Sequence, residues 1–173
     1  MTVNNVIGNN IGMKKAYAGF TLIELLVTIA VAAIVITVAL PSFGDFIRNN
    51  RLVTQANTLI TSLNIARSEA IKRGMTVNVC SSNNQISCTS TNWKDGWIVV
   101  TTDATPEVLR VYESLSGQSS LTNATTTIGY KGSGFLNGAA STFQLCDERT
   151  AETGRQISVS LTGHPSVQDL NCT

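Results

Sequence analysis

The pattern of apolar and polar positions divides the 173-residue chain into parts in which the apolar residues recur at different spacings. Residues 20–40 are apolar almost throughout and contain one charged side chain, Glu24. As an α-helix, these 21 residues would span roughly 31 Å, about the thickness of the hydrocarbon core of a bilayer. We therefore predict a membrane-spanning helix over residues 20–40.

Three other interpretations of this segment compete with a membrane-spanning helix that contacts a partner inside the membrane. A cleaved secretory signal usually has an apolar core of about 7–15 residues and a small-x-small site, whereas this run is longer and ends in Leu40-Pro41-Ser42-Phe43. A plain single-pass anchor leaves Glu24 unexplained, because a carboxylate inside the membrane costs at least about 3 kcal/mol unless it faces a partner. A buried helix of a soluble protein is disfavoured, because the run is too uniformly apolar for an ordinary amphipathic helix.

Helical periodicity resumes over residues 41–73. Pro41 lacks an N–H and clashes with the preceding turn, so it can only kink or interrupt the helix. We predict that this amphipathic half packs on its own domain and ends at Arg73-Gly74, a basic last turn followed by a glycine cap. The apolar stripe with a 4-3-4-3-4 spacing consists of Leu52, Ala56, Leu59, Leu63, Ala66 and Ala70.

The period changes to two over residues 74–173, which we predict to form a β-rich globular domain. In the last run, Ile157, Val159 and Leu161 share one face. Short runs separated by Asn-, Gly-, Ser- and Asp-rich turns are typical of antiparallel sheets. The predicted fold class is therefore α+β, with a long N-terminal helix packed on the β domain. The predicted strands cover residues 76–80, 97–102, 108–113, 125–130, 142–146 and 155–162.

The charges and the cysteines argue against strong polyanion binding and against a zinc site. Only 13% of the residues are charged, and residues 74–173 carry five basic and eight acidic side chains, so no charge run indicates a strong polyanion-binding face. The four cysteines include no CxxC pair and do not fit a zinc ligand set. In an exported chain an even count favours two disulfides, with buried free thiols as the alternative.

Enzymatic activity finds little support in the sequence. His164 is the only histidine and lies in the turn-like tripeptide Gly163-His-Pro165. Ser133 lacks the glycine spacing of a nucleophile elbow. We therefore expect no catalytic residues, no cofactor and no metal site.

Residues 19–24, which read Gly-Phe-Thr-Leu-Ile-Glu, resemble the cleavage and methylation signature of type IV prepilins and type II secretion pseudopilins. The resemblance implies that residues 1–19 are a leader, that prepilin peptidase cuts after Gly19, and that the new N-terminal residue, Phe20, is methylated. The leader would have 7 residues instead of 19 if translation begins at Met13, and the sequence leaves that start open.

The same resemblance gives Glu24 a role in assembly and Pro41 the role of a helix kink. Glu24 lies one helical turn from the new amine, so in a helix bundle its carboxylate can neutralise the terminal amine of a neighbouring subunit. Lys14 and Lys15 should hold the N-terminal side in the cytoplasm. The C-terminal domain of the inner-membrane precursor would then lie in the periplasm until the subunit joins a filament.

The C-terminal part resembles the GspH/FimT-type minor pilins and pseudopilins. This resemblance implies two antiparallel sheets in a sandwich-like arrangement, and the disulfides Cys80–Cys88 and Cys146–Cys172, one of three possible pairings. It also implies a minor subunit, at or near the filament tip, that primes assembly with other pilins. A type II secretion pseudopilin shares the same signature. The matching residues are Ala66-Arg-Ser-Glu-Ala70, Cys80 with Cys88, Trp93-Lys-Asp-Gly-Trp97, and Gly154-Arg155.

DNA binding is the alternative function. Some FimT-type minor pilins take up DNA in natural transformation and resemble this chain up to a C-terminal Gly-Arg-x-Arg segment. Here the matching stretch, residues 163–166, reads Gly-His-Pro-Ser and has no arginine. Arg149, Arg155, Lys131 and His164 could still line a weak patch, but the domain is acidic and DNA affinity depends mainly on phosphate neutralisation.

Overall fold

The computed structural model describes residues 19–149 and 152–172, apart from the side chains of residues 38–42. Lys14, Lys15 and the predicted leader up to residue 18 lie outside the described residues. The chain forms two compact units that divide between Phe43 and Gly44.

A single helix, α1 (Leu22–Arg73), contributes to both units. It begins where Thr21 Oγ1 accepts the backbone N–H of Glu24 at 3.3 Å, which satisfies one of the free donors of the first turn. Helical structure continues through Pro41, so the proline does not interrupt the helix. A kink at Pro41 stays a prediction.

The part of α1 in the second unit supplies the centre of the core. All six residues of the predicted apolar stripe are at most 2% exposed, which confirms that the stripe packs on its own domain. The helix ends at Gly74, which has a φ of 66°, and the N–H of Met75 donates to the carbonyl of Ala70. This is the glycine-capped ending that the sequence predicted.

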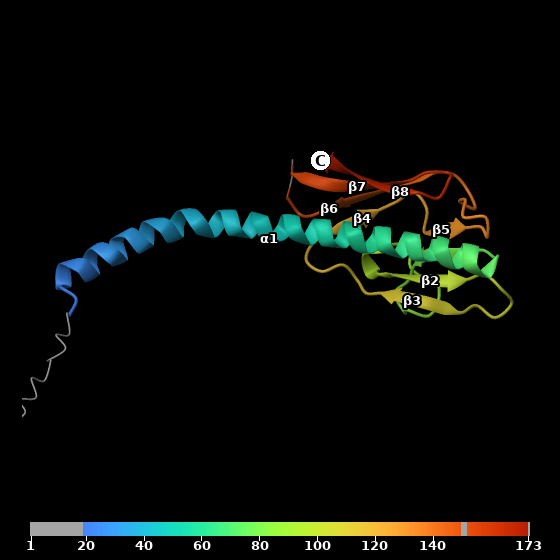
Figure 1. Cartoon of the computed structure of the whole chain (residues 1–173), viewed down its shortest axis with the longest axis horizontal. Helices are drawn as coiled ribbons and strands as arrows, with labels where there is room; N and C mark the ends of the chain where they lie inside the picture. Colours follow the sequence, from blue (N-terminus) through green and yellow to red (C-terminus); the bar gives the residue numbers. More distant parts are fainter. Residues whose placement is uncertain (1–18, 150–151, 173) are drawn as a thin grey trace, which may run out of the picture. The chain divides into compact units, whose positions relative to one another are not determined.

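Two four-stranded antiparallel sheets complete the second unit (Figure 1). The strand order is β3-β2-β1-β5 in the first sheet and β4-β6-β7-β8 in the second. The fold is α+β, as predicted. The strands are β1 Val77–Ser81, β2 Trp97–Thr101, β3 Val108–Tyr112, β4 Ser120–Thr122, β5 Thr127–Tyr130, β6 Ser141–Cys146, β7 Thr153–Val159 and β8 Pro165–Asn171, and a short 3-10 helix, η1, covers Trp93–Asp95.

Two tryptophans connect the helix and the sheets. Trp97 in β2 donates its indole N–H to Ser62 Oγ of α1 at 3.0 Å. Trp93 packs edge-on against Phe143 of β6, with 4.9 Å between ring centroids. Both indoles are 1% exposed. Large aromatic side chains thus join β2 to the helix and η1 to the second sheet.

The last predicted strand differs from the observed one. β7 ends at Val159, and the chain then turns into β8, a strand that the sequence pattern did not predict. Ile157 and Val159 are buried, but Leu161 is 58% exposed because it lies in the turn. The prediction that Leu161 shares the core-facing side of that strand is therefore wrong.

Candidate functional site

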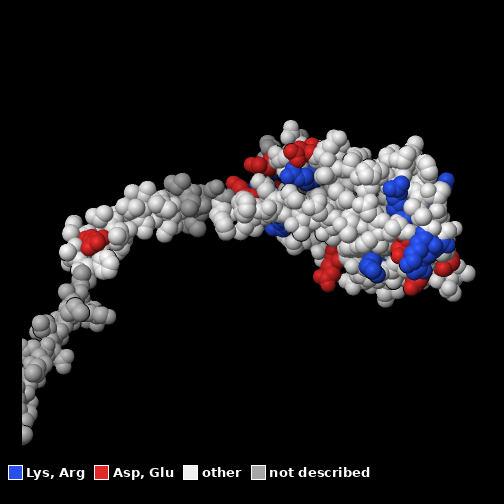
Figure 2. All heavy atoms as spheres, viewed as in Figure 1, with Lys and Arg blue, Asp and Glu red and all other residues white. Residues whose placement is uncertain are grey.

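The first unit carries apolar side chains that are exposed along its described length. Phe20 is 85% exposed, and every large apolar side chain from Leu22 to Ile36 is at least 53% exposed. In Figure 2 this part of the chain is white apart from one acidic group. Exposed apolar surface of this extent marks a protein or membrane interaction site.

The polar groups inside this apolar segment are largely satisfied by the helix itself. The hydroxyls of Thr28 and Thr37 each donate to a backbone carbonyl three residues earlier, at 2.8 Å. Such bonds let a threonine enter an apolar environment without an unpaired hydroxyl. Over the residues whose side chains are described, no helix is long and apolar enough to cross a membrane.

Glu24 is the exception in this segment. Its side chain is exposed and lies in the first turn of α1, where the positive end of the helix dipole favours an acid. Within the described part of the chain, no cationic group lies within ion-pair distance of its carboxylate. The arrangement leaves a carboxylate available to a cation from another molecule, four residues along the chain from Phe20.

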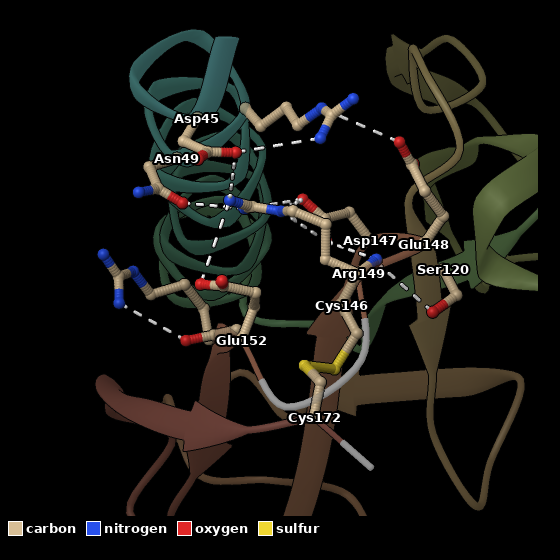
Figure 3. Close-up of polar contacts among 12 residues, drawn as sticks. Asp45, Asn49, Ser120, Cys146, Asp147, Glu148, Arg149, Glu152 and Cys172 are labelled. Carbon is tan, nitrogen blue, oxygen red and sulfur yellow. Dashed lines mark hydrogen bonds and ion pairs between the residues drawn. A yellow bond between two sulfur atoms is a disulfide. The ribbon is translucent and has the colours of Figure 1, made fainter. Parts of the chain in front are cut away.

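A second polar site joins the segment after β6 to α1 within the second unit (Figure 3). The side chains of Arg149 and Asp147 are 10% and 2% exposed, and their Nη2 and Oδ2 atoms are 2.8 Å apart. Arg149 also donates to Asn49 Oδ1 at 2.7 Å, and its Nη1 lies 3.4 Å from Asp45 Oδ1 and 3.9 Å from Glu152 Oε2. We refer to these five residues as the Arg149 cluster.

The electrostatics of the Arg149 cluster favour the charged forms of its central pair. Burial alone would raise the pKa of Asp147, but hydrogen bonds from Arg149 and its charge outweigh burial and lower the pKa below the usual 3.8. The hydrogen bond that Arg149 donates to Asp147 in turn raises the pKa of Arg149. A carboxyl whose pKa is lower in the folded than in the unfolded chain stabilises the fold above its unfolded pKa, and this contribution is lost as pH falls through the folded pKa.

We expect Asp147→Asn to lower the free energy of unfolding by about 2 kcal/mol at pH 7, because Arg149 loses its buried charged partner. The difference between the wild type and the variant should begin to shrink as pH falls below about 4, where Asp147 of the unfolded chain takes up a proton, and should shrink further through the lowered pKa of folded Asp147. Urea unfolding of the purified protein at pH 7 and pH 2.5 measures both values. Glu113→Gln, an exposed acid outside the cluster, is the control. A difference that stays constant over this range would contradict the assignment.

The structure contains two disulfides and no free cysteine among the described residues. The Cα atoms of Cys80 and Cys88 are 5.5 Å apart, and those of Cys146 and Cys172 are 6.0 Å apart. These are the pairings that the family resemblance implied. The second disulfide attaches the end of β8 next to the Arg149 cluster, as Figure 3 shows.

The residues considered for DNA contact lie on separate elements, and the two arginines among them are paired with carboxylates. Arg149 is enclosed in its cluster, and Arg155 of β7 pairs with Asp169 of β8. His164 lies in the β7–β8 turn and Lys131 follows β5. Figure 2 likewise shows basic groups of this unit with acidic groups beside them. The two arginines are therefore bound to carboxylates rather than presented to a phosphate backbone.

Sequence reasoning missed the helix partners of Arg149. Asp45 and Asn49 are 104 and 100 residues away in the chain, and no motif connects these positions. The only available signal was an acidic and amide pair one turn apart at the start of the amphipathic half of the helix. That signal is too common on exposed helix surfaces to identify a partner.

Comparisons with solved structures agree with the architecture. The type IV minor pilin FimU of Pseudomonas aeruginosa superposes with a TM-score of 0.59 at 20% identity, over 71% of this chain and 92% of that chain. The minor pseudopilin EpsH of the Vibrio cholerae type 2 secretion system superposes with a TM-score of 0.52 at 11% identity, over 70% of this chain and 97% of that chain. At these identities the similarity establishes the fold. A search of curated proteins finds no significant match.

Two family models match the sequence itself. The prokaryotic N-terminal methylation motif matches residues 14–40, which include Gly19, Phe20 and Glu24. The model described as type II transport protein GspH matches residues 55–163, more than half of the chain. The chain therefore belongs to the GspH family, and its fold is that of pilin-like proteins.

Proposed function

We propose that this chain is a minor pilin or pseudopilin that primes assembly of a type IV pilus or type II secretion pseudopilus, at or near its tip. The observation that carries the proposal is the carboxylate of Glu24, which has no ion-pair partner among the described residues and lies in the first turn of an exposed apolar helix. Membership of the GspH family and the methylation motif support it, since members of this family are filament components anchored in the inner membrane. The folds of FimU and EpsH, a minor pilin and a minor pseudopilin, support a minor role.

Processing by prepilin peptidase is the first step of the proposed function. Gly19 is exposed and precedes α1, and a Cβ atom placed on it would meet no atom within 4 Å. A residue without a side chain lets a peptidase approach the backbone closely. Cleavage after Gly19 releases Phe20 as the new N-terminal residue, and its amine is then methylated.

Cleavage creates a positively charged amine at Phe20, and the role of Glu24 is to neutralise it. Residues 20–40 hold the precursor in the inner membrane as a single span, with the second unit in the periplasm. An amine cation at Phe20 would lie beside the positive end of the helix dipole, which is an unfavourable combination. In an apolar bundle, the carboxylate of Glu24 from a neighbouring subunit neutralises that amine, and the low dielectric makes the pair far better than either charge alone. Assembly is therefore non-covalent and sets the register between subunits.

Mass spectrometry of the mature polypeptide tests the processing step. We expect an N-methylated Phe20 as the first residue when the protein is recovered from its own host. In cells that lack prepilin peptidase, the control, the leader should be retained. Any other first residue in the wild-type host would overturn the proposed function. Recovery from sheared pili or from a secretion pseudopilus then decides between the two kinds of filament.

A further inference from the structure

Three large apolar side chains are exposed where the end of α1 meets two loops of the second unit. They are Ile71 in the last turn of α1, Phe135 between β5 and β6, and Leu161 in the β7–β8 turn, and they are 52%, 52% and 58% exposed. We refer to these three residues as the apolar patch. They come from segments far apart in the sequence, so the fold itself brings them to the same end of the unit.

Contacts between the three segments show that they are joined directly. The Cδ1 atom of Ile71 would lie 2.8 Å from a Cβ atom placed on Gly134, so the side chain rests on the backbone next to Phe135. The N–H of Leu136 donates to the carbonyl of Leu161 at 3.1 Å. Ile71 and Leu161 therefore make these contacts themselves, and Phe135 lies between the two residues, Gly134 and Leu136, that they contact.

The backbone beneath the patch is closely packed. Arg67 of α1 donates its Nε–H to the carbonyl of Gly134 at 3.0 Å. A Cβ atom on Gly163 would lie 2.3 Å from that same carbonyl oxygen and 3.1 Å from the ring of buried Tyr130. A surface held in this way loses little conformational entropy when a partner binds, which favours its use in recognition.

The two loops of the patch carry charges of one sign. Residues 114–146 contain Lys131 as their only charged residue, and residues 156–168 contain no Asp, Glu, Lys or Arg. Arg67 is half-buried beside Gly134, and Lys131 is exposed next to the loop that carries Phe135. The patch therefore combines apolar side chains with cations and has no acid of its own in the two loops that form it.

We propose that the apolar patch is the docking surface for a second, different pilin-type subunit, whose apolar contact surface carries a carboxylate opposite Arg67 and Lys131. This inference rests on the proposed function, because the partner is a component of the same filament. Pairing of the patch with the same patch on a second copy is disfavoured, because it would bring the cations of the two copies together. DNA is disfavoured as well, because phosphate binding requires several free cations, and here apolar groups fill the contact surface.

Photo-crosslinking of the full-length protein in its own host tests the proposal. The photoreactive residue p-benzoylphenylalanine replaces Phe135, or replaces Ile86 in the control. Ile86 is matched because it is also a large exposed apolar residue, 73% exposed, in the loop closed by the Cys80–Cys88 disulfide. We expect position 135, and not position 86, to give an adduct in the sheared filament fraction. Mass spectrometry of that adduct should identify a different polypeptide that begins with the same type of methylated apolar helix.

A variant with Phe135→Ser and Leu161→Ser measures the strength of the contact. Both side chains are more than half exposed, so the variant should fold, and co-purification of the crosslinked partner should fall about tenfold or more. Ile86→Ser should leave co-purification unchanged. The fold-loss should be similar at low and moderate salt, because the two serines remove apolar contacts and leave Arg67 and Lys131 in place.

The outcomes separate this inference from the proposed function. If the wild-type protein enters filaments but position 135 gives no adduct, or gives one no more often than position 86, the docking surface is wrong and the filament role stands. A nuclease-sensitive adduct, or an adduct between two copies through position 135, also overturns the docking proposal. If the wild-type protein never enters a filament, the proposed function fails, and the inference fails with it.

Discussion

Replacing Glu24 with valine is expected to exclude the subunit from filaments while leaving it expressed, membrane-bound and cleaved after Gly19. The valine leaves the methylated amine of the neighbouring Phe20 without a partner inside the apolar bundle. Removing one member of a buried ion pair costs about 3–5 kcal/mol, which corresponds to a decrease in incorporation of about a hundredfold or more. Quantitative immunoblotting of the sheared filament fraction against total membranes measures the decrease.

Two further variants show whether the carboxylate itself is responsible. Glu24→Gln keeps the shape and the helix propensity but removes the charge, so it should fail nearly as completely as valine. Thr21→Val removes the hydroxyl that accepts the Glu24 N–H, and should cost only about 1 kcal/mol because it weakens a helix cap and leaves the charge in place. If the Gln variant were incorporated normally, hydrogen bonding or packing, rather than charge neutralisation, would explain the acid at this position.

Gly19→Ala is expected to fail at an earlier step. A Cβ atom at Gly19 would meet nothing within 4 Å, so the fold of the subunit itself tolerates alanine. Loss of processing would therefore come from the peptidase, and the uncleaved precursor should accumulate in the membrane. The two variants thus separate cleavage from assembly: the Glu24 variants should be mature but unassembled, and the Gly19 variant should be immature. Normal incorporation of both Glu24→Val and Gly19→Ala would refute the assembly mechanism.

The helix and the central strands could be predicted because their apolar residues follow local patterns. The stripe from Leu52 to Ala70 follows the helical period, β6 alternates between buried and more exposed residues, and β1 and β2 are short runs that are almost entirely buried. β8 could not be predicted in this way. It is an edge strand whose residues after Pro165 are almost all exposed, so its sequence shows neither alternation nor apolar character. Backbone hydrogen bonds to β7 define this strand, and such bonds do not depend on which side chains the strand carries.

The candidate sites likewise divide into those that a local sequence signature could identify and those that it could not. Gly19, Phe20 and Glu24 lie within six consecutive residues, so a local signature could identify them. The Arg149 cluster and the apolar patch each depend on segments that only the fold brings together. Leu161 illustrates this: its alternation with Ile157 and Val159 indicated the core, but β7 ends two residues earlier because the chain must turn into β8. The alternation of side chains along β7 cannot show where this strand ends, because the next strand, β8, has no alternation that would mark its start.

Gly163→Ala is expected to be among the most destabilising single-methyl substitutions in the second unit. Gly163 has a φ of 78°, which costs an alanine about 1 kcal/mol. The added methyl group would also lie 2.3 Å from the backbone carbonyl oxygen of Gly134 and 3.1 Å from the Tyr130 ring. Backbone and a fully buried ring cannot move aside as a flexible side chain can, so overpacking should add about 3 kcal/mol. Urea or thermal unfolding of the purified protein measures the total.

Gly74→Ala separates the two contributions. Gly74 has a φ of 66°, close to that of Gly163, but a Cβ atom there would meet nothing within 4 Å. Its substitution should therefore cost only the backbone term, about 1 kcal/mol. The difference between the two variants measures the overpacking of a methyl group where the β7–β8 turn packs against the loop that carries Phe135. If the two losses were equal, the close approach of Gly163 to Gly134 would contribute nothing, and the rigid support inferred for the apolar patch would have to be abandoned.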